Sequence, residues 1–257
     1  MKRLTVDTAP GDYTVCRLTP GTEVPRIVAT GLVSVTSTPT EVSVVCPTEH
    51  APDTEHAYPG WRLLTVRGPV RALLAAERSA LNIASRASGI ATATRAWVDA
   101  VEGTGAVVLD TRKTTPGLRP LEKYAVRCGG GSNKRMGLYD VAMVKDNHVA
   151  AAGSVAAAVT AVRERAPRVQ VQVEADTPAQ ALEAVEAGAD FLLLDNMAPA
   201  QLREVVALVG GRAELEATGG LTLAVAREVA ATGVDFLSVG ALTHSSPILD
   251  LALDLRS

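Results

Sequence analysis

From Gly105 onward the chain alternates between short apolar runs and amphipathic stretches, and this alternation constrains the fold more than any other feature. The apolar runs are typical of β-strands and cover residues 106–109, 141–144, 169–173, 191–194, 213–215 and 236–239. Stretches with helical periodicity separate most of them, at residues 155–165, 178–187, 199–209 and 223–232. Because strands joined through helices run parallel, the pattern predicts a parallel sheet, either open or closed into a barrel.

The 257 residues are enough for one barrel with a small additional domain. The N-terminal part has a different character, since short β-like runs rich in Thr, Val and Pro are punctuated there by Pro and Gly. Within the part that follows, Pro69 and the spacing of alanines and leucines predict one helix, and a second helix is expected over residues 90–101. We therefore predict a fold of the α/β class, organised as a small strand-rich α+β domain at residues 1–69, a helical connection at 70–104, a TIM-like parallel β/α barrel, complete or incomplete, at 105–245, and a C-terminal segment at 246–257 that packs back on the N-terminal domain.

Composition excludes several classes of function. The net charge of −3 and the absence of a basic cluster argue against nucleic-acid binding. No apolar run approaches the roughly 18 residues that a membrane span needs, and the N-terminus lacks the apolar stretch of a signal peptide. Three cysteines without CxxC spacing argue against a disulfide framework or a zinc site. These features predict a cytoplasmic protein with no nucleic-acid or membrane partner.

Polar residues and glycines follow the predicted strands at the points where the strands end. Cations come after the first two strands, carboxylates after the next two, and glycine turns after the last two. The residues concerned are Arg112, Lys113, Lys145, Glu174, Asp195, Gly219, Gly220 and Gly240. Since a parallel barrel gathers the carboxyl ends of its strands at one mouth, we expect these residues to surround one cavity.

The residue types in this set indicate an anionic small-molecule substrate. Arg112, Lys113, Arg135 and Lys145 would form a cationic pocket suited to carboxylates and phosphates, and an arginine can hold a carboxylate through two parallel hydrogen bonds. Carboxylates beside phosphate groups, here Glu174 and Asp195, usually hold Mg²⁺ or ribose hydroxyls. Glycine turns allow backbone N–H groups to approach a phosphate closely.

Several stretches of the chain resemble the quinolinate phosphoribosyltransferase family. The most specific is the block at residues 110–147, which reads DTRKTTPGLRPLEKYAVRCGGGSNKRMGLYDVAMVKDN. Shorter matching stretches occur at residues 77–82, 88–92, 173–174, 193–197, 217–220 and 238–245. The resemblance covers residues 66–257 and implies a β/α barrel enzyme, a decarboxylating pentosyltransferase. The implied reaction is that of quinolinate with phosphoribosyl pyrophosphate and Mg²⁺, which gives nicotinate mononucleotide, pyrophosphate and CO₂.

The resemblance also implies roles for individual residues. It assigns quinolinate binding to Arg78, Arg112, Lys134, Arg135 and Lys145, with Lys113 in the same pocket near the phosphates. It makes Lys113, Lys145, Glu174 and Asp195 catalytic, with Glu174 and Asp195 holding the ribose and its Mg²⁺ directly or indirectly. It assigns the 5′-phosphate to Thr218, Gly219, Gly220 and Gly240. In this family the position of Arg78 reaches the active site of a neighbouring subunit, which implies a homodimer or a hexamer built as a trimer of dimers.

The chain departs from the family pattern in two places. Lys134 stands where the family usually has His, so a phosphoribosyltransferase that acts on another pyridine or related acid is one alternative function. Residues 11–68 resemble part of an ACT-type regulatory domain, at 12–18, 32–47 and 60–69, and not the usual N-terminal domain of the family. This second departure motivates another alternative, a non-catalytic ligand-binding homologue.

Overall fold

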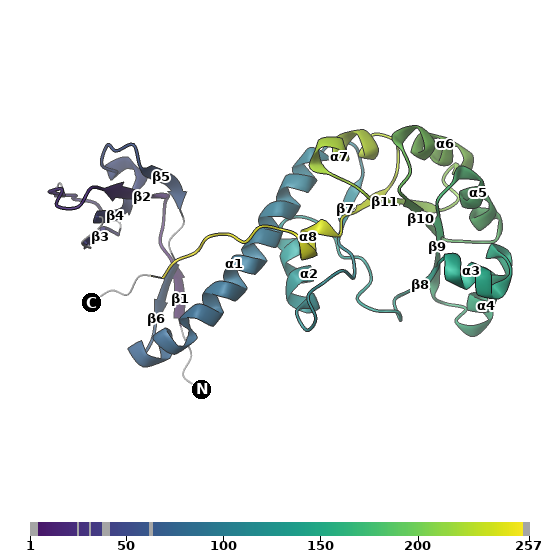
Figure 1. The fold of residues 1–257 in the computed structure, drawn as a ribbon, viewed down its shortest axis with the longest axis horizontal. Helices are drawn as coiled ribbons and strands as arrows, with labels where there is room; N and C mark the ends of the chain where they lie inside the picture. Colours follow the sequence, from purple (N-terminus) through teal and green to yellow (C-terminus); the bar gives the residue numbers. More distant parts are fainter. Residues whose placement is uncertain (1–4, 25, 31, 38–41, 62–63, 254–257) are drawn as a thin grey trace. The chain divides into compact units, whose positions relative to one another are not determined.

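The computed structural model describes residues 5–24, 26–30, 32–37, 42–61 and 64–253. The chain divides into two compact units, residues 1–78 and 79–257 (Figure 1). The boundary falls inside the long helix α1 (Val70–Ala100), whereas the sequence predicted a boundary at residue 69.

Antiparallel strands build the N-terminal unit. Its four-stranded sheet has the order β3-β4-β2-β5, and a separate pair joins β1 to β6. The bounds are β1 (Thr5–Thr8), β2 (Tyr13–Leu18), β3 (Ser34–Ser37), β4 (Val42–Pro47), β5 (Ala57–Trp61) and β6 (Leu64–Arg67). Cys16, Val44 and Cys46 form its small buried core. The predicted strand-rich domain is confirmed, and the helical element that the structure describes before α1 is the single turn η1 (Thr48–His50).

Helix α1 is one continuous helix of 31 residues, so the prediction of two helices in this region was wrong. Gly89, just before the second predicted helix, is buried inside α1 and provides room for another segment. A Cβ atom at Gly89 would lie 2.0 Å from the carbonyl oxygen of Pro247. The amide of Leu249 donates to the carbonyl of Ser85 at 3.0 Å, so this part of the C-terminal segment runs along α1. That the segment also packs on the N-terminal domain stays a prediction.

The close approach at Gly89 gives a testable expectation. Alanine in place of glycine inside a helix normally adds stability, but here the added methyl group collides with the backbone of Pro247. We expect Gly89→Ala to lower the free energy of unfolding by about 1–3 kcal/mol, the usual cost of overpacking. Chemical denaturation measures this loss. Asn82→Ala, on an exposed position of the same helix, serves as the control and should be neutral or slightly stabilising.

Six parallel strands form the sheet of the second unit, in the order β7-β12-β11-β10-β9-β8. The strands are β7 (Val107–Leu109), β8 (Val141–Val144), β9 (Gln170–Ala175), β10 (Phe191–Asp195), β11 (Glu214–Thr218) and β12 (Phe236–Ser238). The helices are α2 (Arg119–Cys128), α3 (Asp146–Ala152), α4 (Val155–Arg165), α5 (Pro178–Glu186), α6 (Pro199–Val209), α7 (Leu223–Ala230) and α8 (Ala241–His244). Figure 1 shows α4, α5, α6 and α7 along the outer face of a curved sheet whose edges are β7 and β8. This arrangement confirms the predicted TIM-like barrel in its incomplete form.

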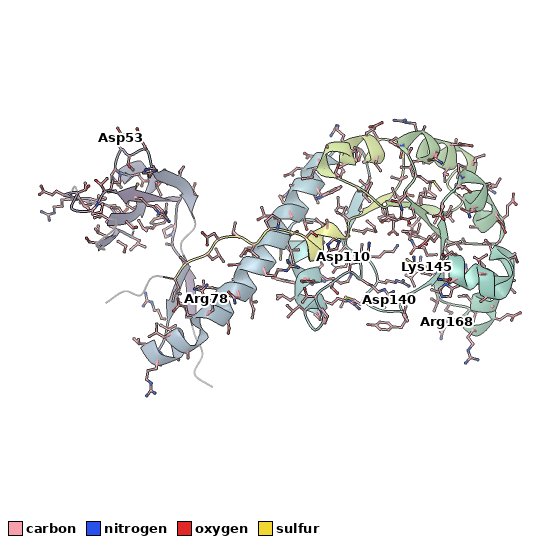
Figure 2. All side chains as sticks on the ribbon, viewed as in Figure 1. Asp53, Arg78, Asp110, Asp140, Lys145 and Arg168 are labelled. Carbon is pink, nitrogen blue, oxygen red and sulfur yellow. The ribbon has the colours of Figure 1, made fainter. Side chains whose placement is uncertain are left out.

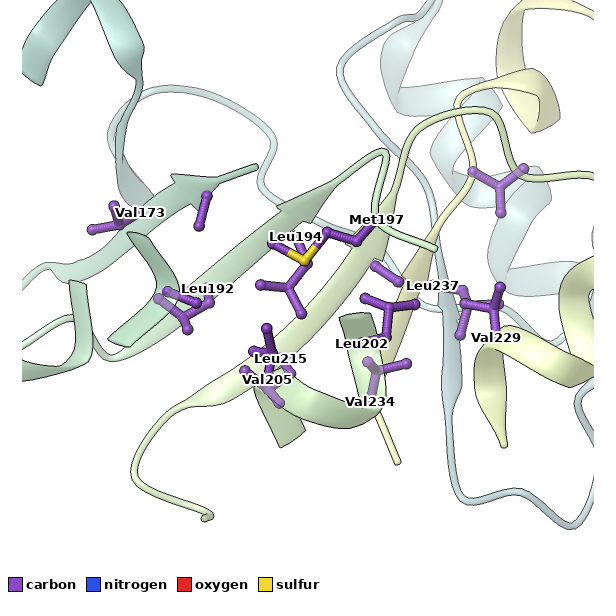
Figure 3. Close-up of a cluster of buried hydrophobic side chains, with 14 of the residues drawn as sticks. Val173, Leu192, Leu194, Met197, Leu202, Val205, Leu215, Val229, Val234 and Leu237 are labelled. Carbon is purple, nitrogen blue, oxygen red and sulfur yellow. The ribbon is translucent and has the colours of Figure 1, made fainter. Parts of the chain in front are cut away.

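Strand alternation separates the core of this unit from its cavity. In β10, Leu192 and Leu194 point outward and pack against the covering helices, as Figure 3 shows. Leu193 and Asp195, the alternate residues of the same strand, line the cavity instead. Since successive side chains of a strand point to opposite faces, one strand serves both the core and the site.

Within the described part of the chain, no helix has the length and apolarity to cross a membrane.

Candidate active site

A cavity of about 620 Å³ lies at the carboxyl ends of the six parallel strands. Its lining comprises Asp110, Thr111, Arg112, Lys113, Arg119, Lys134, Arg135, Met143, Lys145, Glu174, Leu193, Asp195, Glu216, Thr218, Gly219, Gly220, Leu221, Ser238, Val239, Gly240, Ala241 and His244. Figure 2 labels two of these residues, Asp110 and Lys145. Asp110 follows the edge strand β7 and Lys145 follows the opposite edge strand β8, so the lining extends across the whole sheet. The predicted convergence of the strand ends on one cavity therefore agrees with the structure.

Every site residue predicted from the sequence lines this cavity except Arg78, which is exposed on helix α1. The predicted set of site residues omitted other lining residues, above all Asp110, Arg119 and Glu216. The sequence carried a signal for two of these residues, Asp110 and Glu216. Asp110 directly follows the first predicted strand and lies two residues before Arg112, and Glu216 lies two residues before Thr218, the spacing that puts two side chains on the same face of a strand.

The loop after β7 presents Arg112 and Lys113 to the cavity and is held by Arg119 from helix α2. The Arg119 guanidinium donates to Thr114 Oγ1 at 2.9 Å and to the Arg112 carbonyl at 3.3 Å. It also donates to the Met136 carbonyl at 2.9 Å, and so it joins this loop to the loop that carries Arg135. A single planar group with several donors can satisfy three acceptors at once.

Arg135 brings a second guanidinium close to that of Arg112. Its side chain is largely buried, and it donates to the Val141 carbonyl at 2.9 Å. Burial lowers the pKa of Arg135, and the nearby charge of Arg112 lowers it further. Two cations held in proximity disfavour each other, and an anion bound between them relieves that repulsion.

Two carboxylates face these cations from the neighbouring strands β9 and β10. Glu174 is paired with the ammonium group of Lys145, and Asp195 accepts a hydrogen bond from Asn196 Nδ2 at 3.0 Å. Asn196 has a φ of 53°, in the left-handed region that residues other than glycine seldom adopt. The backbone amide of Asn196 donates to the Thr218 carbonyl at 2.9 Å, which fixes the turn after β10 against β11.

Lys134 extends into the barrel interior and meets Glu216. Its Nζ lies 2.5 Å from Glu216 Oε2 and 3.5 Å from the ring centre of Phe191. Burial lowers the pKa of Lys134, and the charge of Glu216 opposes that effect. Glu216 also accepts hydrogen bonds from Gln172 Nε2, at 2.7 Å, and from Ser238 Oγ. The positive charge of Lys134 is therefore largely balanced by a buried carboxylate.

A buried ion pair lies beneath the cationic loops. Asp110 and Lys123 are both almost fully buried and are bonded to each other. Asp110 also accepts from the Lys134 amide at 2.8 Å and from Asn133 Nδ2 at 2.6 Å. Burial raises the pKa of the Asp110 carboxyl, and the hydrogen bond from Lys123 opposes this. The pair thus fixes the backbone from which Lys134 extends.

Glycine turns form the remaining side of the cavity. Gly219 has a φ of 85°, and a Cβ atom there would lie 2.3 Å from Asn196 Oδ1 and 2.7 Å from Asp195 Oδ1. At Gly240 a Cβ atom would lie 3.1 Å from Lys113 Cδ and 3.2 Å from His244 Nε2. Glycine is required at Gly219 for its backbone conformation and for the close approach of the two side chains.

This geometry gives a second testable expectation. We expect Gly219→Ala to displace Asp195 and Asn196 and to weaken binding of a phosphorylated ligand by about 10-fold or more, by misplacing groups that must be aligned. Gly211→Ala is the matched control, because Gly211 has a similar φ of 77° but no atom lies within 4 Å of the position that an added methyl group would take. Calorimetric titration with phosphoribosyl pyrophosphate compares the two proteins. Equal affinities would show that the close contact at Gly219 is unimportant for binding.

The fold and the cavity together define a β/α barrel protein with a binding site for a small, multiply charged anion at its strand ends. Comparison with known protein families narrows this class. The family model for the C-terminal domain of quinolinate phosphoribosyl transferase matches residues 90–254. The chain belongs to the quinolinate phosphoribosyltransferase family. A separate model, for the N-terminal domain of a different family, matches residues 11–54, which agrees with the predicted change of family in the N-terminal part.

Individual relatives agree with this assignment. The chain is 53% identical over 199 residues to the nicotinate-nucleotide pyrophosphorylase [carboxylating] of Mycobacterium leprae, and the aligned region covers 76% of this chain and 70% of the relative. It is 42% identical over 210 residues to the human enzyme of the same name, which covers 79% of this chain and 71% of the relative. Among solved structures, nicotinate-nucleotide pyrophosphorylase from Ehrlichia chaffeensis matches with a TM-score of 0.74 and 31% identity, over 97% of this chain and 89% of that one.

Proposed function

We propose that this chain transfers the phosphoribosyl group of phosphoribosyl pyrophosphate to quinolinate and releases CO₂, which gives nicotinate mononucleotide and pyrophosphate. The observation that carries the proposal is the convergence of Arg112, Arg135 and Lys145 on one cavity that is also lined by Glu174, Asp195 and the glycine turns. Cations suit the two carboxylates of quinolinate, and the remaining groups suit a ribose phosphate.

Each group has a part in the proposed reaction. The pyridine nitrogen attacks the anomeric carbon, the C–O bond to pyrophosphate breaks, and pyrophosphate leaves with the electron pair. Arg112, Arg135 and Lys145 would hold the carboxylates so that the nitrogen faces the anomeric carbon, which removes much of the entropic barrier. Lys113 would balance charge on the phosphates, and Thr218, Gly219, Gly220 and Gly240 would hold the 5′-phosphate.

Decarboxylation then follows from the chemistry of the product. Once its nitrogen is quaternary, the ring carries a positive charge beside the carbon that bears the 2-carboxylate. That charge stabilises the carbanion left when CO₂ departs, and a proton from solvent completes the product. We assign no general base to this step, because the ring cation supplies the stabilisation.

Magnesium fits the residues at this site. In the described part of the chain, no group of three or more His, Cys, Asp or Glu side chains gathers to hold a metal by protein ligands alone. Glu174 and Asp195 line the same cavity, and one or two carboxylates together with substrate oxygens are the usual magnesium site. We propose that these two residues hold Mg²⁺ directly or through water. The ion would supply charge stabilisation for the departing pyrophosphate.

We also propose that the working form is an oligomer, a homodimer or a hexamer of three dimers. Arg78 belongs to the predicted site but does not line the cavity. It is exposed on α1 and could complete the site of a second copy of the chain. Sedimentation of the wild-type protein, with mixing of Arg78→Ala and Lys145→Met variants to restore activity in hybrid oligomers, tests this part.

A second candidate function changes only the acceptor. It is favoured by Lys134, whose ammonium group is paired with Glu216 and lies over the ring of Phe191. The charge of Lys134 is therefore balanced within the protein and is not available to pair with a substrate carboxylate. Calorimetric titration of the wild type and of Lys134→His with quinolinate, nicotinate and other pyridine carboxylates separates the candidates. Quinolinate should bind the wild type at least about 10-fold more tightly than a monocarboxylate, because a charged pair is lost with each missing carboxylate. Preference of the wild type for another acid, reversed in Lys134→His, would support the second candidate.

A further inference from the structure

Glu122, on helix α2, is a buried carboxylate outside the cavity lining that collects hydrogen bonds from two separate segments. It is completely buried. The Thr115 amide and the Thr115 hydroxyl donate to it at 3.0 and 2.8 Å. The Arg86 guanidinium donates to it through Nε at 3.3 Å and through Nη2 at 3.0 Å. Glu122 therefore ties the end of the loop that carries Arg112 and Lys113 to helix α1.

Arg86 extends this network to the other side of the cavity. Its Nη2 donates to the carbonyl oxygen of Thr243, in helix α8 next to the Gly240 turn. Thr243 is also buried, and its hydroxyl donates to the Lys113 carbonyl at 2.8 Å. The bonds thus form a closed circuit through Glu122, Thr115, Lys113, Thr243 and Arg86.

The circuit joins two parts of the cavity wall that present different groups to the cavity. The loop after β7 presents Arg112 and Lys113, whereas α8 and the turn before it present Gly240 and His244. Neither Glu122 nor Arg86 lines the cavity, so neither can bind substrate in this arrangement. An ion pair with a fully buried member such as Glu122 gives little net stability compared with apolar packing, so alignment of the two segments is a better reason for the pair.

We infer that Glu122 and Arg86 are positioning residues that set the spacing between the acceptor half of the site and the 5′-phosphate half. The inference rests on the proposed function for its kinetic consequence, although the network itself does not. Each half can still bind its own ligand when the circuit is broken. What suffers is the alignment of the two bound ligands, which governs the rate of the bond-forming step.

The test compares Glu122→Gln with a matched control, Asp190→Asn. Asp190 likewise accepts from an arginine, Arg163 at 2.6 Å, and from a backbone amide, Val171 at 2.8 Å, but it lies before β10 at the opposite end of the strands. For Glu122→Gln we expect kcat per folded molecule to fall by about 10- to 100-fold. We expect the Kd for quinolinate alone, and for phosphoribosyl pyrophosphate alone, to change by less than about 3-fold, because the groups that contact each ligand remain. Asp190→Asn should keep the wild-type kcat.

Hydrogen–deuterium exchange provides a readout that does not depend on turnover. Residues 111–118 and 240–246 should both exchange faster in Glu122→Gln than in the wild type, while Asp190→Asn leaves both segments protected. A wild-type protein that fails to turn over quinolinate would count against the proposed function only, since exchange still tests the circuit. Unchanged exchange in both segments, or a wild-type kcat per folded molecule in Glu122→Gln, would overturn the inference.

Discussion

Replacement of Lys145 by Met is expected to lower kcat/KM for quinolinate by about 10²- to 10³-fold, the usual effect of removing one charge-stabilising group from an active site. Lys145 directly follows strand β8 and is paired with Glu174 of the neighbouring strand β9. In Lys145→Met, the carboxylates of Glu174 and Asp195 would repel the dianionic acceptor, and no ammonium group at position 145 would offset that repulsion. Methionine keeps most of the length of the lysine side chain, so the loss is electrostatic.

Steady-state kinetics of purified Lys145→Met, with each substrate varied in turn, measures this effect. Arg203→Gln is the control, because it removes the same unit of positive charge from an exposed position on α6, remote from the cavity lining. That variant should behave as the wild type. A Lys145→Met protein that retains more than about a tenth of the wild-type kcat/KM would contradict the assigned role, since a single good ion pair is worth more than that.

The second large effect is expected on stability, at the Lys134–Glu216 pair. Glu216 is 2% exposed and satisfies Lys134, Gln172 Nε2 and Ser238 Oγ together. Glu216→Gln leaves the Lys134 charge without its partner, and removing one member of a buried pair costs about 3 kcal/mol or more. For a protein of this size that loss lowers the melting temperature by about 6–12 °C.

Thermal unfolding followed by circular dichroism measures the shift, and a second substitution provides the control. Lys134→Met in the Glu216→Gln background removes the stranded charge and should recover most of the lost stability. If Glu216→Gln melts with the wild type, the pair makes no net contribution. If the double variant is less stable than Glu216→Gln, the loss arises from Gln172 and Ser238, and the charge of Lys134 is not its cause.

Much of the barrel and its site could be predicted because both follow from local pattern. Apolar runs such as residues 191–194 define strands, and polar residues such as Asp195 mark where they end. In a parallel sheet those ends share one edge, so a one-dimensional pattern predicts a three-dimensional cluster. The order of residues along the chain was therefore enough to place Glu174, Asp195 and the glycine turns around one cavity.

Features that depend on packing between distant segments could not be predicted in this way. Two helices were predicted where the structure has one, and the backbone of Pro247, distant in sequence, explains the glycine at position 89 inside that continuous helix. Glu122 and Lys123 are charged residues in an amphipathic helix, where the pattern indicates solvent exposure, yet both are buried in ion pairs. Their partners, Arg86 and Asp110, lie 36 and 13 residues away in sequence.

Phosphoribosyl transfer to quinolinate is tested most directly by the stoichiometry of its products. Wild-type protein with Mg²⁺, phosphoribosyl pyrophosphate and quinolinate labelled in its 2-carboxylate should release pyrophosphate and labelled CO₂ in equal amounts, with nicotinate mononucleotide as the nucleotide product. Lys145→Met should lose both signals together. Pyrophosphate release without CO₂, or binding of quinolinate with no release of either, would contradict the proposed reaction and leave the chain an anion-binding barrel of another activity.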